Sequence, residues 1–400
     1  MAKGRNIAVG IDVGTNQIKV IVAEKDPKNE LDSLPRIIGT GISESRGIRH
    51  GFVTSVNDAA LSIKAAVQQA EKSSALPIKK AYISVGGIGL GAIISVGSVA
   101  VTKADNEITD LDVKRAIEES EKELPNSYIQ NRKIIHTIPL EYRIDGKKVL
   151  GRPQGLKGVR LEARVLYITC LAHHLSDLML AFEEADIEII DVTAAPMAAS
   201  LVTLTKTQKI AGCVLANIGS ETTTIIVFEN NIPVSMETFQ IGSNDITNDL
   251  ALGLKISIEE ADLIKLGQGK IGEFSKRRVE EIVVARLSDI FDLIEDHLRK
   301  IDRNGLLPAG IILTGGGSGI PNIEELSRLA LKLPSKQSRL RMEGNIKSMA
   351  RDFEWPVAYG LAIFGLTSEN EDDAIDMGFG RRWFNQTRQN IWGWIKQFLP

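Results

Sequence analysis

The stretches GIDVGTNQIKVIV at residues 10–22 and LANIGSETTTIIVF at residues 215–228 decide the fold of this chain, because they repeat one pattern. Each has apolar residues, a tight turn at a glycine and then period-2 alternation, which predicts a strand, a turn and a second strand. The two stretches align position by position: Asp12 with Asn217, Gly14 with Gly219, Val20 with Ile225 and Val22 with Val227. The sequence therefore predicts two similar lobes, one in each half of the chain.

The composition is that of an ordinary globular protein long enough for more than one core. Of the 400 residues, 43% are hydrophobic and 25% charged, and a net charge of -3 gives no bulk reason for nucleic-acid binding. Cys170 and Cys213 lie in apolar runs, so we expect buried thiols in a reducing compartment. We also expect a cytosolic protein, because the N-terminus lacks a secretory pattern and no uncharged apolar stretch approaches the roughly 20 residues that span a bilayer.

Helical and strand-like patterns alternate along the rest of the chain. DAALSIKAAVQQAEKS at residues 58–73 has helical periodicity, whereas KAYISVGG at 80–87 and RVLYITCLA at 164–172 are typical of strands. This alternation predicts α/β layers. In a two-lobed α/β fold we expect a ligand to bind between the lobes, with one glycine turn reaching in from each side.

The two glycine turns favour phosphate binding. Such turns expose consecutive backbone N–H groups that suit phosphate oxygens, and the side chains of Thr15, Asn16, Ser220 and Thr222 add donors. Asp12 would orient Mg²⁺ through water, because this ion prefers oxygen ligands and keeps part of its hydration. Either turn alone is more simply explained as a plain hairpin, and only the matched pair favours a phosphate site.

A third glycine cluster occurs in GIILTGGGSGIPNIEELSRLA at residues 310–330. Here an apolar strand, three glycines and a helix follow one another, and backbone without side chains can approach a flat purine and its sugar closely. The spacing differs from a P-loop, which needs G-x-x-x-x-G-K-[ST], and from a G-x-G-x-x-G dinucleotide fingerprint after the first strand. The cluster alone is a weak signal for nucleotide binding.

In this order, the three glycine segments resemble the phosphate-1, phosphate-2 and adenosine motifs of the actin-like ATPase superfamily. Residues 191–204 and 355–366 resemble its connecting helices. Within the superfamily, residues 134–170 and 239–269 are similar to the FtsA family of bacterial cell-division actin homologues. The resemblance covers nearly the whole chain. It implies an α/β, actin-like (ribonuclease H-like) two-lobed ATPase fold with an inserted small α/β subdomain and a C-terminal amphipathic helix.

The resemblance implies roles for residues that match the family's motifs. ATP and Mg²⁺ are the implied cofactors, with Asp12 and Asn217 as candidates for positioning the metal ion and water. Arg286 falls where the family contacts the C-terminal peptide of the tubulin homologue FtsZ. The implied nucleotide contacts are Asp12, Gly14, Thr15, Asn16, Gly219, Ser220, Glu221, Thr222, Gly242, Asp262, Lys265, Gly315, Gly316, Gly317 and Ser318.

One position departs from the family pattern. The head of the second phosphate loop is usually Asp, often followed by further glycines, whereas this chain has Asn217, Ile218, Gly219 and Ser220. A neutral amide supplies no negative charge near Mg²⁺, and hydrogen bonds to charged groups are worth roughly 1.5–3 kcal/mol against about 1 kcal/mol for neutral pairs. We therefore expect ATP binding with slow or undetectable hydrolysis.

RRWFNQTRQNIWGWIKQFLP at residues 381–400 closes the chain with three of its four tryptophans. At helical spacing its apolar and polar residues form opposite faces, which favours a helix lying in a membrane interface. Docking on the protein's own core or in a partner groove is the alternative. The acidic composition of residues 368–378 predicts a solvated tether before it. The expected membrane contacts are Arg381, Arg382, Trp383, Phe384, Arg388, Ile391, Trp392, Trp394, Ile395, Lys396, Phe398 and Leu399.

The patterns and the resemblance together suggest a division of the chain into subdomains. The expected units are a first lobe core at 1–84, completed by about 162–192 and 354–367; an inserted subdomain at 85–161; a second lobe core at 193–240, completed by about 280–353; a nucleotide-side subdomain at 241–279; an acidic linker at 368–378; and a membrane-targeting helix at 379–400.

The resemblance implies an ATP-binding protein that polymerises on the inner face of the cytoplasmic membrane and anchors FtsZ filaments at the division septum. The implied partners are other copies of the chain, the FtsZ C-terminal peptide, anionic membrane lipid and other division proteins that contact the inserted subdomain. A pilus-assembly actin homologue is the nearest alternative, and the cationic terminal helix argues against it. A small-molecule kinase of this fold would need a general-base carboxylate and a second-substrate pocket, and the sequence identifies neither.

Overall fold

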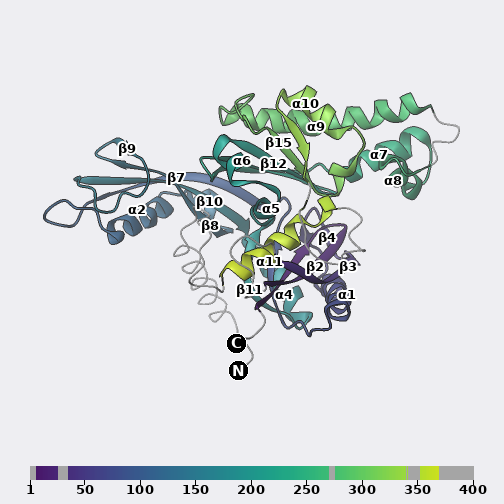
Figure 1. Cartoon of the computed structure of the whole chain (residues 1–400), viewed down its shortest axis with the longest axis horizontal. Helices are drawn as coiled ribbons and strands as arrows, with labels where there is room; N and C mark the ends of the chain where they lie inside the picture. The colour runs from purple at the N-terminus through teal and green to yellow at the C-terminus, as the bar shows by residue number, and fades with distance from the viewer. Residues whose placement is uncertain (1–5, 26–34, 270–274, 339, 341–351, 369–400) are drawn as a thin grey trace.

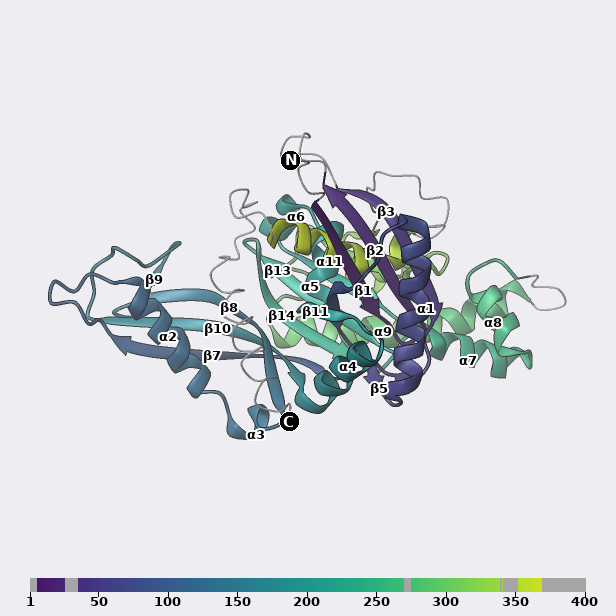
Figure 2. The same cartoon turned by 90° about the horizontal axis from the view of Figure 1, so that it is seen from below.

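The computed structural model describes residues 6–25, 35–269, 275–338, 340 and 352–368. The expected terminal helix at 379–400 lies outside these residues. Figure 1 and Figure 2 show two large lobes, each built on a sheet, and a smaller unit that projects from one side. Among the described helices, none is at once long and apolar enough to cross a bilayer.

The first large sheet is built around the N-terminal glycine turn. Its strand order is β11-β6-β1-β2-β3, and β1 pairs antiparallel with β2 and parallel with β6. Buried apolar residues run along its central strands, as expected for a sheet covered on both faces. The strands are β1 (Asn6–Val13), β2 (Gln17–Lys25), β3 (Arg36–Glu44), β6 (Lys80–Val85) and β11 (Glu188–Ala194).

The second large sheet repeats this arrangement strand for strand. Its order is β14-β13-β12-β15-β16, with β12 antiparallel to β13 and parallel to β15. β12 therefore corresponds to β1 and β13 to β2, which confirms the duplication predicted from the two repeated stretches. The strands are β12 (Cys213–Ile218), β13 (Thr223–Glu229), β14 (Ile232–Phe239), β15 (Ile311–Thr314) and β16 (Ser335–Gln337).

Two apolar helices, α5 (Ala195–Thr203) and α11 (Pro356–Ser368), pack together at the centre of the molecule (Figure 1). α11 contacts β1, β2 and β6 of the first sheet, while α5 contacts β12 and β13 of the second. A Cβ added at Gly10 would lie 2.8 Å from the Ala362 nitrogen, so glycine permits the close approach of β1 to α11. Because α11 is apolar on all sides, its sequence requires burial of this kind.

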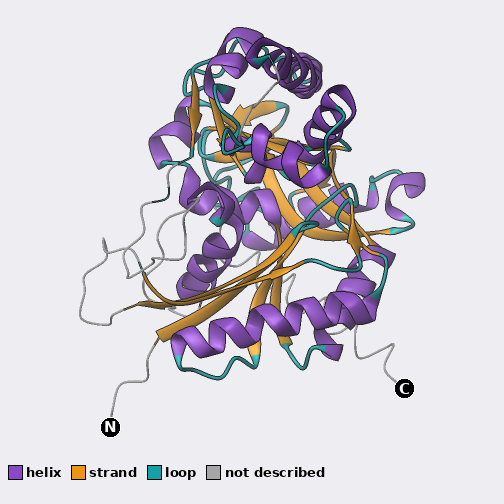
Figure 3. Ribbon diagram, turned by 90° about the vertical axis from the view of Figure 1, so that its right-hand side faces the viewer, coloured by secondary structure: helices purple, strands orange, loops and turns teal. Residues whose placement is uncertain are grey.

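Helices cover the outer faces of both lobes, as Figure 3 shows, and the long ones, such as Val56–Ser74 and Lys276–Lys300, bury one side only. Along β12, Cys213 and Leu215 join the core that contains α5 and α11, whereas Val214 and Ala216 join a separate core under the helices of the second lobe. A short helix, α6 (Lys206–Ala211), leads into β12. The covering helices are α1 (Val56–Ser74) and α4 (Ala172–Glu184) on the first lobe, and α7 (Ser243–Leu254), α8 (Ile258–Lys265), α9 (Lys276–Lys300) and α10 (Ile323–Leu331) on the second.

The projecting unit between β6 and α4 has its own antiparallel sheet and its own core. The strand order is β7-β10-β8-β9, and the helix α2 packs on β7 and β10. Cys170 in β10 is a buried free thiol, like Cys213 in β12, as the sequence predicts. The elements are β7 (Leu90–Ala100), α2 (Asp110–Lys122), α3 (Asn126–Ile129), β8 (Arg132–Ile144), β9 (Lys147–Val149) and β10 (Arg160–Leu171).

Candidate functional site

The two glycine turns have the same hydrogen-bonded shape. In the first turn (residues 14–17), the Gly14 N–H donates to the Gln17 carbonyl at 3.2 Å. In the second turn (residues 219–222), the Gly219 N–H donates to the Thr222 carbonyl at 2.8 Å. A Cβ at either glycine would lie 2.9 Å from that same carbonyl oxygen, so any larger residue would force a shift. The repeat in the sequence is therefore also a repeat of turn geometry.

Asp12 is the charged residue beside the first turn. The Ser84 hydroxyl donates to Asp12 Oδ1 at 2.9 Å, and Lys19 stands opposite Asp12 across the β1–β2 pair. Desolvation by burial raises the pKa of Asp12, while Lys19 and the Ser84 hydroxyl oppose this rise without cancelling it. The ionised carboxylate is therefore only partly compensated, and a bound cation would stabilise it further.

Asn217 occupies the matching position beside the second turn and faces a neutral residue across the strand pair. Thr224 stands opposite Asn217, where Lys19 stands in the first lobe. Asn217 Oδ1 also lies against Gly315, where an added Cβ would strike it. Gly315 has a φ of 84° and donates its N–H to the Phe353 carbonyl at 2.9 Å. This glycine is thus required both by its backbone angle and by its packing on Asn217.

The third glycine cluster forms a turn of 3-10 helix, η1 (Gly316–Gly319), directly after β15. Ser318 is buried and its hydroxyl donates to the Gly315 carbonyl at 2.7 Å, which holds the turn together. A Cβ at Gly317 would strike β12, whereas one at Gly316 would come no closer than 4.0 Å to an atom of the described residues. Gly316 is therefore the glycine of this trio with room beside it.

A small hairpin that the sequence did not single out lies beside the first turn. Its strands are β4 (Ile48–Arg49) and β5 (Phe52–Val53). His50 and Gly51 join them with φ angles of 49° and 83°, and two left-handed residues are typical of a tight two-residue hairpin. A Cβ at Gly51 would lie 2.5 Å from the Gly87 Cα, so the tip packs tightly on the first lobe. We call residues 48–53 the bridging hairpin.

The bridging hairpin gives one backbone N–H to each of the two turns. The His50 N–H donates to Glu221 Oε2 at 2.6 Å, and the Gly51 N–H donates to Thr15 Oγ1 at 3.1 Å. Arg49 Nε also lies 3.3 Å from Glu221 Oε1. Two adjacent residues of the first lobe therefore bring Thr15 and Glu221 into one site.

The beginning of α7 is hydrogen-bonded to the second turn. The N–H groups of Ser243 and Asn244 donate to the carbonyls of Gly219 and Ser220, at 2.9 and 2.7 Å. A Cβ at Gly242 would lie 2.5 Å from the Ser220 carbonyl oxygen. Gly242 therefore allows α7 to approach the second turn closely.

Asp262 and Lys265 on α8 are connected to α7. Lys265 is buried, and its Nζ donates to Asp262 Oδ1 at 2.6 Å, to Thr247 Oγ1 at 2.7 Å and to the Ser243 carbonyl at 3.3 Å. These acceptors match the three donors of an ammonium group. Lys265 thus joins α8 to α7. The Lys265 side chain is shielded from solvent, and the Asp262 side chain is half exposed.

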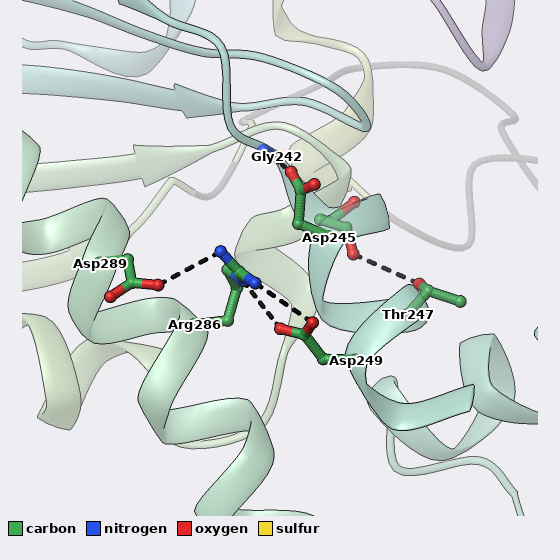
Figure 4. A network of polar contacts seen from close by, with 7 residues as sticks. Gly242, Asp245, Thr247, Asp249, Arg286 and Asp289 are labelled. Carbon is green, nitrogen blue, oxygen red and sulfur yellow. Dashed lines mark hydrogen bonds and ion pairs between the residues drawn. The ribbon is translucent and has the colours of Figure 1, made fainter. Parts of the chain in front are cut away.

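Arg286 lies on α9 within a network of acids that extends from α7 (Figure 4). Its Nε and Nη2 donate to Asp249 Oδ2 and Oδ1 at 2.8 and 3.1 Å, and its Nη1 donates to Asp289 Oδ2 at 3.3 Å. The hydrogen bond with Asp249 is the main cause that raises the pKa of Arg286. On α7, which also carries Asp249, the Asp245 side chain caps the start of the helix by accepting the Gly242 N–H at 2.8 Å. α7 therefore contacts the second turn at its start and Arg286 near its middle.

The structure brings together the residues predicted from all three glycine segments and from α7 and α8. Their roles toward a ligand stay predictions, and the predicted membrane contacts lie outside the described residues. Sequence reasoning missed Ser84, which binds Asp12, and the bridging hairpin. The only local signal for the hairpin was the His50-Gly51 pair between two short segments, Ile48–Arg49 and Phe52–Val53, and nothing in that signal pointed to the two turns.

The fold and its paired turns define the class of protein: a two-lobed chain of the actin-like ATPase fold. A solved structure titled "PilM-PilN type IV pilus biogenesis complex" matches with a TM-score of 0.67 and 15% identity, covering 90% of this chain and 98% of that chain. MreB5 of Spiroplasma citri bound to ADP matches with a TM-score of 0.51 and 12% identity, covering 90% and 95%. At such identities the likeness shows the fold alone.

The chain belongs to the FtsA family of bacterial cell-division proteins. The family model "Cell division protein FtsA" matches residues 214–360, and "SHS2 domain inserted in FTSA" matches residues 90–169. Cell division protein FtsA of Bacillus subtilis is 30% identical over 378 residues, with 89% of this chain and 82% of that protein covered. FtsA of Pseudomonas aeruginosa is 26% identical, with 91% and 90% covered. The resemblance predicted from the sequence is thereby confirmed.

Proposed function

We propose that the chain binds ATP with Mg²⁺ at the two turns, the third glycine cluster and the start of α7. The observation that carries this proposal is the pair of equal glycine turns held by one hairpin. Glycine turns suit phosphate oxygens because they leave backbone N–H groups accessible. MreB5 of Spiroplasma citri, which shares the fold, has been solved bound to ADP, and this supports nucleotide binding by the present chain.

The residues beside the first turn fit a Mg²⁺ ion. Asp12 offers an oxygen ligand whose ionised form is poorly solvated in the protein alone. Among the described residues, no three or more His, Cys, Asp or Glu side chains are grouped to hold a metal ion. Most ligands of a Mg²⁺ ion would therefore be water and phosphate oxygens, with Asp12 acting directly or through water. A bound ion would neutralise phosphate charge, and the Asn217 amide would orient water beside it.

We further propose that this cell-division protein connects FtsZ filaments to the inner face of the cytoplasmic membrane. Residues 379–400 would lie in the lipid interface. A large apolar side chain contributes roughly 1.5–3 kcal/mol when fully buried, and a basic residue adds about 1 kcal/mol near anionic lipid. One helix would bind reversibly, whereas a filament of many copies would stay attached, because linked sites raise the effective concentration of each next attachment.

The surfaces for protein partners follow from the same proposal. Arg286 and its acidic neighbours on α7 and α9 would contact the C-terminal peptide of FtsZ. Residues 85–161 would form the inserted subdomain that contacts other copies of the chain and other division proteins. Residues 241–279 would form the nucleotide-side subdomain.

Nucleotide binding is tested by titrating ATP into the nucleotide-free protein with and without Mg²⁺, followed by calorimetry. The expected result is saturable binding that weakens when Mg²⁺ is removed, because phosphate charge is then left uncompensated. Absence of binding under both conditions would contradict the nucleotide proposal. A chain with Gly219→Ala, which is expected to disturb the second turn, serves as the negative control.

Membrane and partner binding are tested with liposomes that contain anionic lipid. The full chain should sediment with them, polymer more firmly than monomer, while a chain ending at residue 376 should remain in the supernatant. A labelled FtsZ C-terminal peptide should bind both chains and lose affinity for Arg286→Ala. Equal retention of the full and shortened chains would reject the membrane role without affecting the nucleotide site.

A further inference from the structure

The bridging hairpin contains an arginine, Arg49, next to the two residues through which the hairpin binds both turns. Arg49 ends β4, directly before His50 and Gly51, whose N–H groups donate to Glu221 and Thr15. Arg49 Nε lies 3.3 Å from Glu221 Oε1. A cation that belongs to none of the glycine segments is therefore placed beside Glu221 of the second turn, two residues before the Gly51 N–H that binds the first turn.

The two members of this ion pair differ in how firmly they are held. The Glu221 side chain is 10% exposed and accepts the His50 N–H at 2.6 Å, whereas the Arg49 side chain is 72% exposed. An exposed ion pair joined through one nitrogen contributes little, because water competes for both groups. Glu221 is thus fixed on the hairpin, while Arg49 can exchange its partner at small cost.

A carboxylate within a phosphate-binding turn is unfavourable unless a cation offsets it. A polyphosphate at the second turn would lie near Glu221, and like charges at short range repel. The Arg49 guanidinium offsets the charge of Glu221, and its planar fork of donors also matches phosphate oxygens. Ser220 and Thr222, on either side of Glu221, are neutral, so they do not remove this repulsion.

We propose that Arg49 is a polyphosphate-binding residue that turns toward the outer phosphates when a nucleotide binds and stays near enough to Glu221 to offset its charge. Glu221 remains on the His50 N–H and keeps the hairpin in place. This inference rests on the proposed binding of a nucleotide at the two turns, and it adds a source of specificity. The contact of Arg49 strengthens with phosphate charge, so the site favours ATP over ADP and ADP over AMP.

A second arginine in the chain provides a matched control. Arg36 is 68% exposed and pairs with Glu24, which is 19% exposed, at 3.8 Å. Glu24 and Arg36 are paired across β2 and β3 near the end of β2 that is far from the first turn. Arg36→Ala therefore removes a similar exposed ion pair without touching either turn.

The test compares the wild-type chain with Arg49→Ala and Arg36→Ala by calorimetric titration of ATP, ADP and AMP in Mg²⁺. Arg49→Ala should weaken ATP binding about tenfold and ADP binding about threefold, and it should leave AMP within about twofold, as for the loss of one partly exposed charged contact. Arg36→Ala should match the wild type for all three nucleotides. The loss in Arg49→Ala should shrink at high salt, because screening weakens exposed charge interactions.

The Glu221→Gln variant provides an independent test in the same titration. The amide oxygen still accepts the His50 N–H, but the negative charge is gone and Arg49 is released. ATP binding should become about threefold tighter, and this gain should be larger in the Arg49→Ala background, where no guanidinium offsets the charge of Glu221 and the two residues are therefore coupled. Thermal unfolding of each variant shows whether it is folded.

The outcomes separate this inference from the proposed function. Arg49→Ala with wild-type affinity for ATP overturns the inference and leaves the nucleotide site standing. Equal losses for ATP and AMP also overturn it, because a phosphate contact must depend on the number of phosphates. A wild-type chain that binds none of the three nucleotides ends both the inference and the proposed nucleotide function.

Discussion

The first and second turns share one backbone shape, but the residues beside them carry different charges. Asp12 faces Lys19 beside the first turn, whereas Asn217 faces Thr224 beside the second. The strand order around the two turns is the same, so sheet architecture does not explain the difference. The comparison teaches that one backbone plan serves two chemistries. Beside the first turn, Asp12 offers a carboxylate for a cation. Beside the second turn, Asn217 offers a neutral amide, and the turn itself binds the hairpin through the Glu221 carboxylate.

The largest expected effect comes from making the position beside the first turn neutral, like the matching position beside the second turn. Asp12→Asn should reduce ATP affinity in Mg²⁺ roughly 10–100-fold, because charged hydrogen-bonding partners are worth roughly 1.5–3 kcal/mol. Calorimetric titration with and without Mg²⁺ measures this change. ATP affinity without Mg²⁺ should stay close to that of the wild type, and an unchanged Mg²⁺ dependence would contradict a role of Asp12 in metal binding.

The same substitution should stabilise the nucleotide-free protein at neutral pH. The folded-state pKa of Asp12 is raised above its ordinary value of 3.8, so the ionised carboxylate destabilises the fold. This penalty is present above the folded pKa and disappears below pH 3.8, where Asp12 is protonated in both states. The gain of Asp12→Asn in urea denaturation should therefore be seen at pH 7 and shrink toward pH 3.5. A gain that is equal at both values would contradict desolvation as its cause.

The next largest effect is a loss of stability when the close contact between the second turn and α7 is crowded by an added methyl group. Gly242→Ala would place a Cβ 2.5 Å from the Ser220 carbonyl oxygen and 2.7 Å from the Glu221 nitrogen. Such overpacking typically costs about 1–3 kcal/mol, so we expect a loss of about 2 kcal/mol in the free energy of unfolding, measured by urea denaturation. Gly86→Ala is the control, because its Cβ would meet Ala195 at an ordinary 3.6 Å. Equal stability of the two variants would show that α7 does not depend on this close contact.

The sequence predicted the parts of the site that are encoded locally. Gly14 and Gly219 each stand in a turn between two alternating strands, so neighbouring residues alone indicated the duplicated hairpins. The contact of the His50 N–H with Glu221 joins positions 171 residues apart and uses a backbone group that nearly every residue has. No local pattern encodes such a contact. The three acceptors around Lys265 likewise depend on how α8 packs on α7, which the sequence does not state.

Asn217→Asp tests the comparison in the opposite direction, because it places beside the second turn the carboxylate that Asp12 places beside the first. The added carboxylate supplies a negative ligand near Mg²⁺, so single-turnover hydrolysis of ATP should become severalfold faster. The nucleotide-free chain should lose about 1 kcal/mol of stability, because Thr224 cannot compensate the new charge as Lys19 does for Asp12. Asn217→Ala serves as the control and should not accelerate hydrolysis. An unchanged rate in Asn217→Asp would show that the missing charge is not what limits hydrolysis.

The smallest expected effect is a difference in stability between removing the Thr15 hydroxyl, after Gly14, and removing the Ser220 hydroxyl, after Gly219. Thr15 Oγ1 accepts the Gly51 N–H at 3.1 Å, whereas Ser220 holds α7 through its backbone carbonyl, which accepts the Asn244 N–H at 2.7 Å. Thr15→Ala should therefore cost about 1 kcal/mol in urea denaturation, because a partly buried N–H loses its acceptor. Ser220→Ala keeps its carbonyl and should stay within about 0.5 kcal/mol of the wild type. Thr15→Ser restores the acceptor and should recover most of the loss. Equal costs for Thr15→Ala and Ser220→Ala would mean that the hairpin does not distinguish the two turns through this hydroxyl.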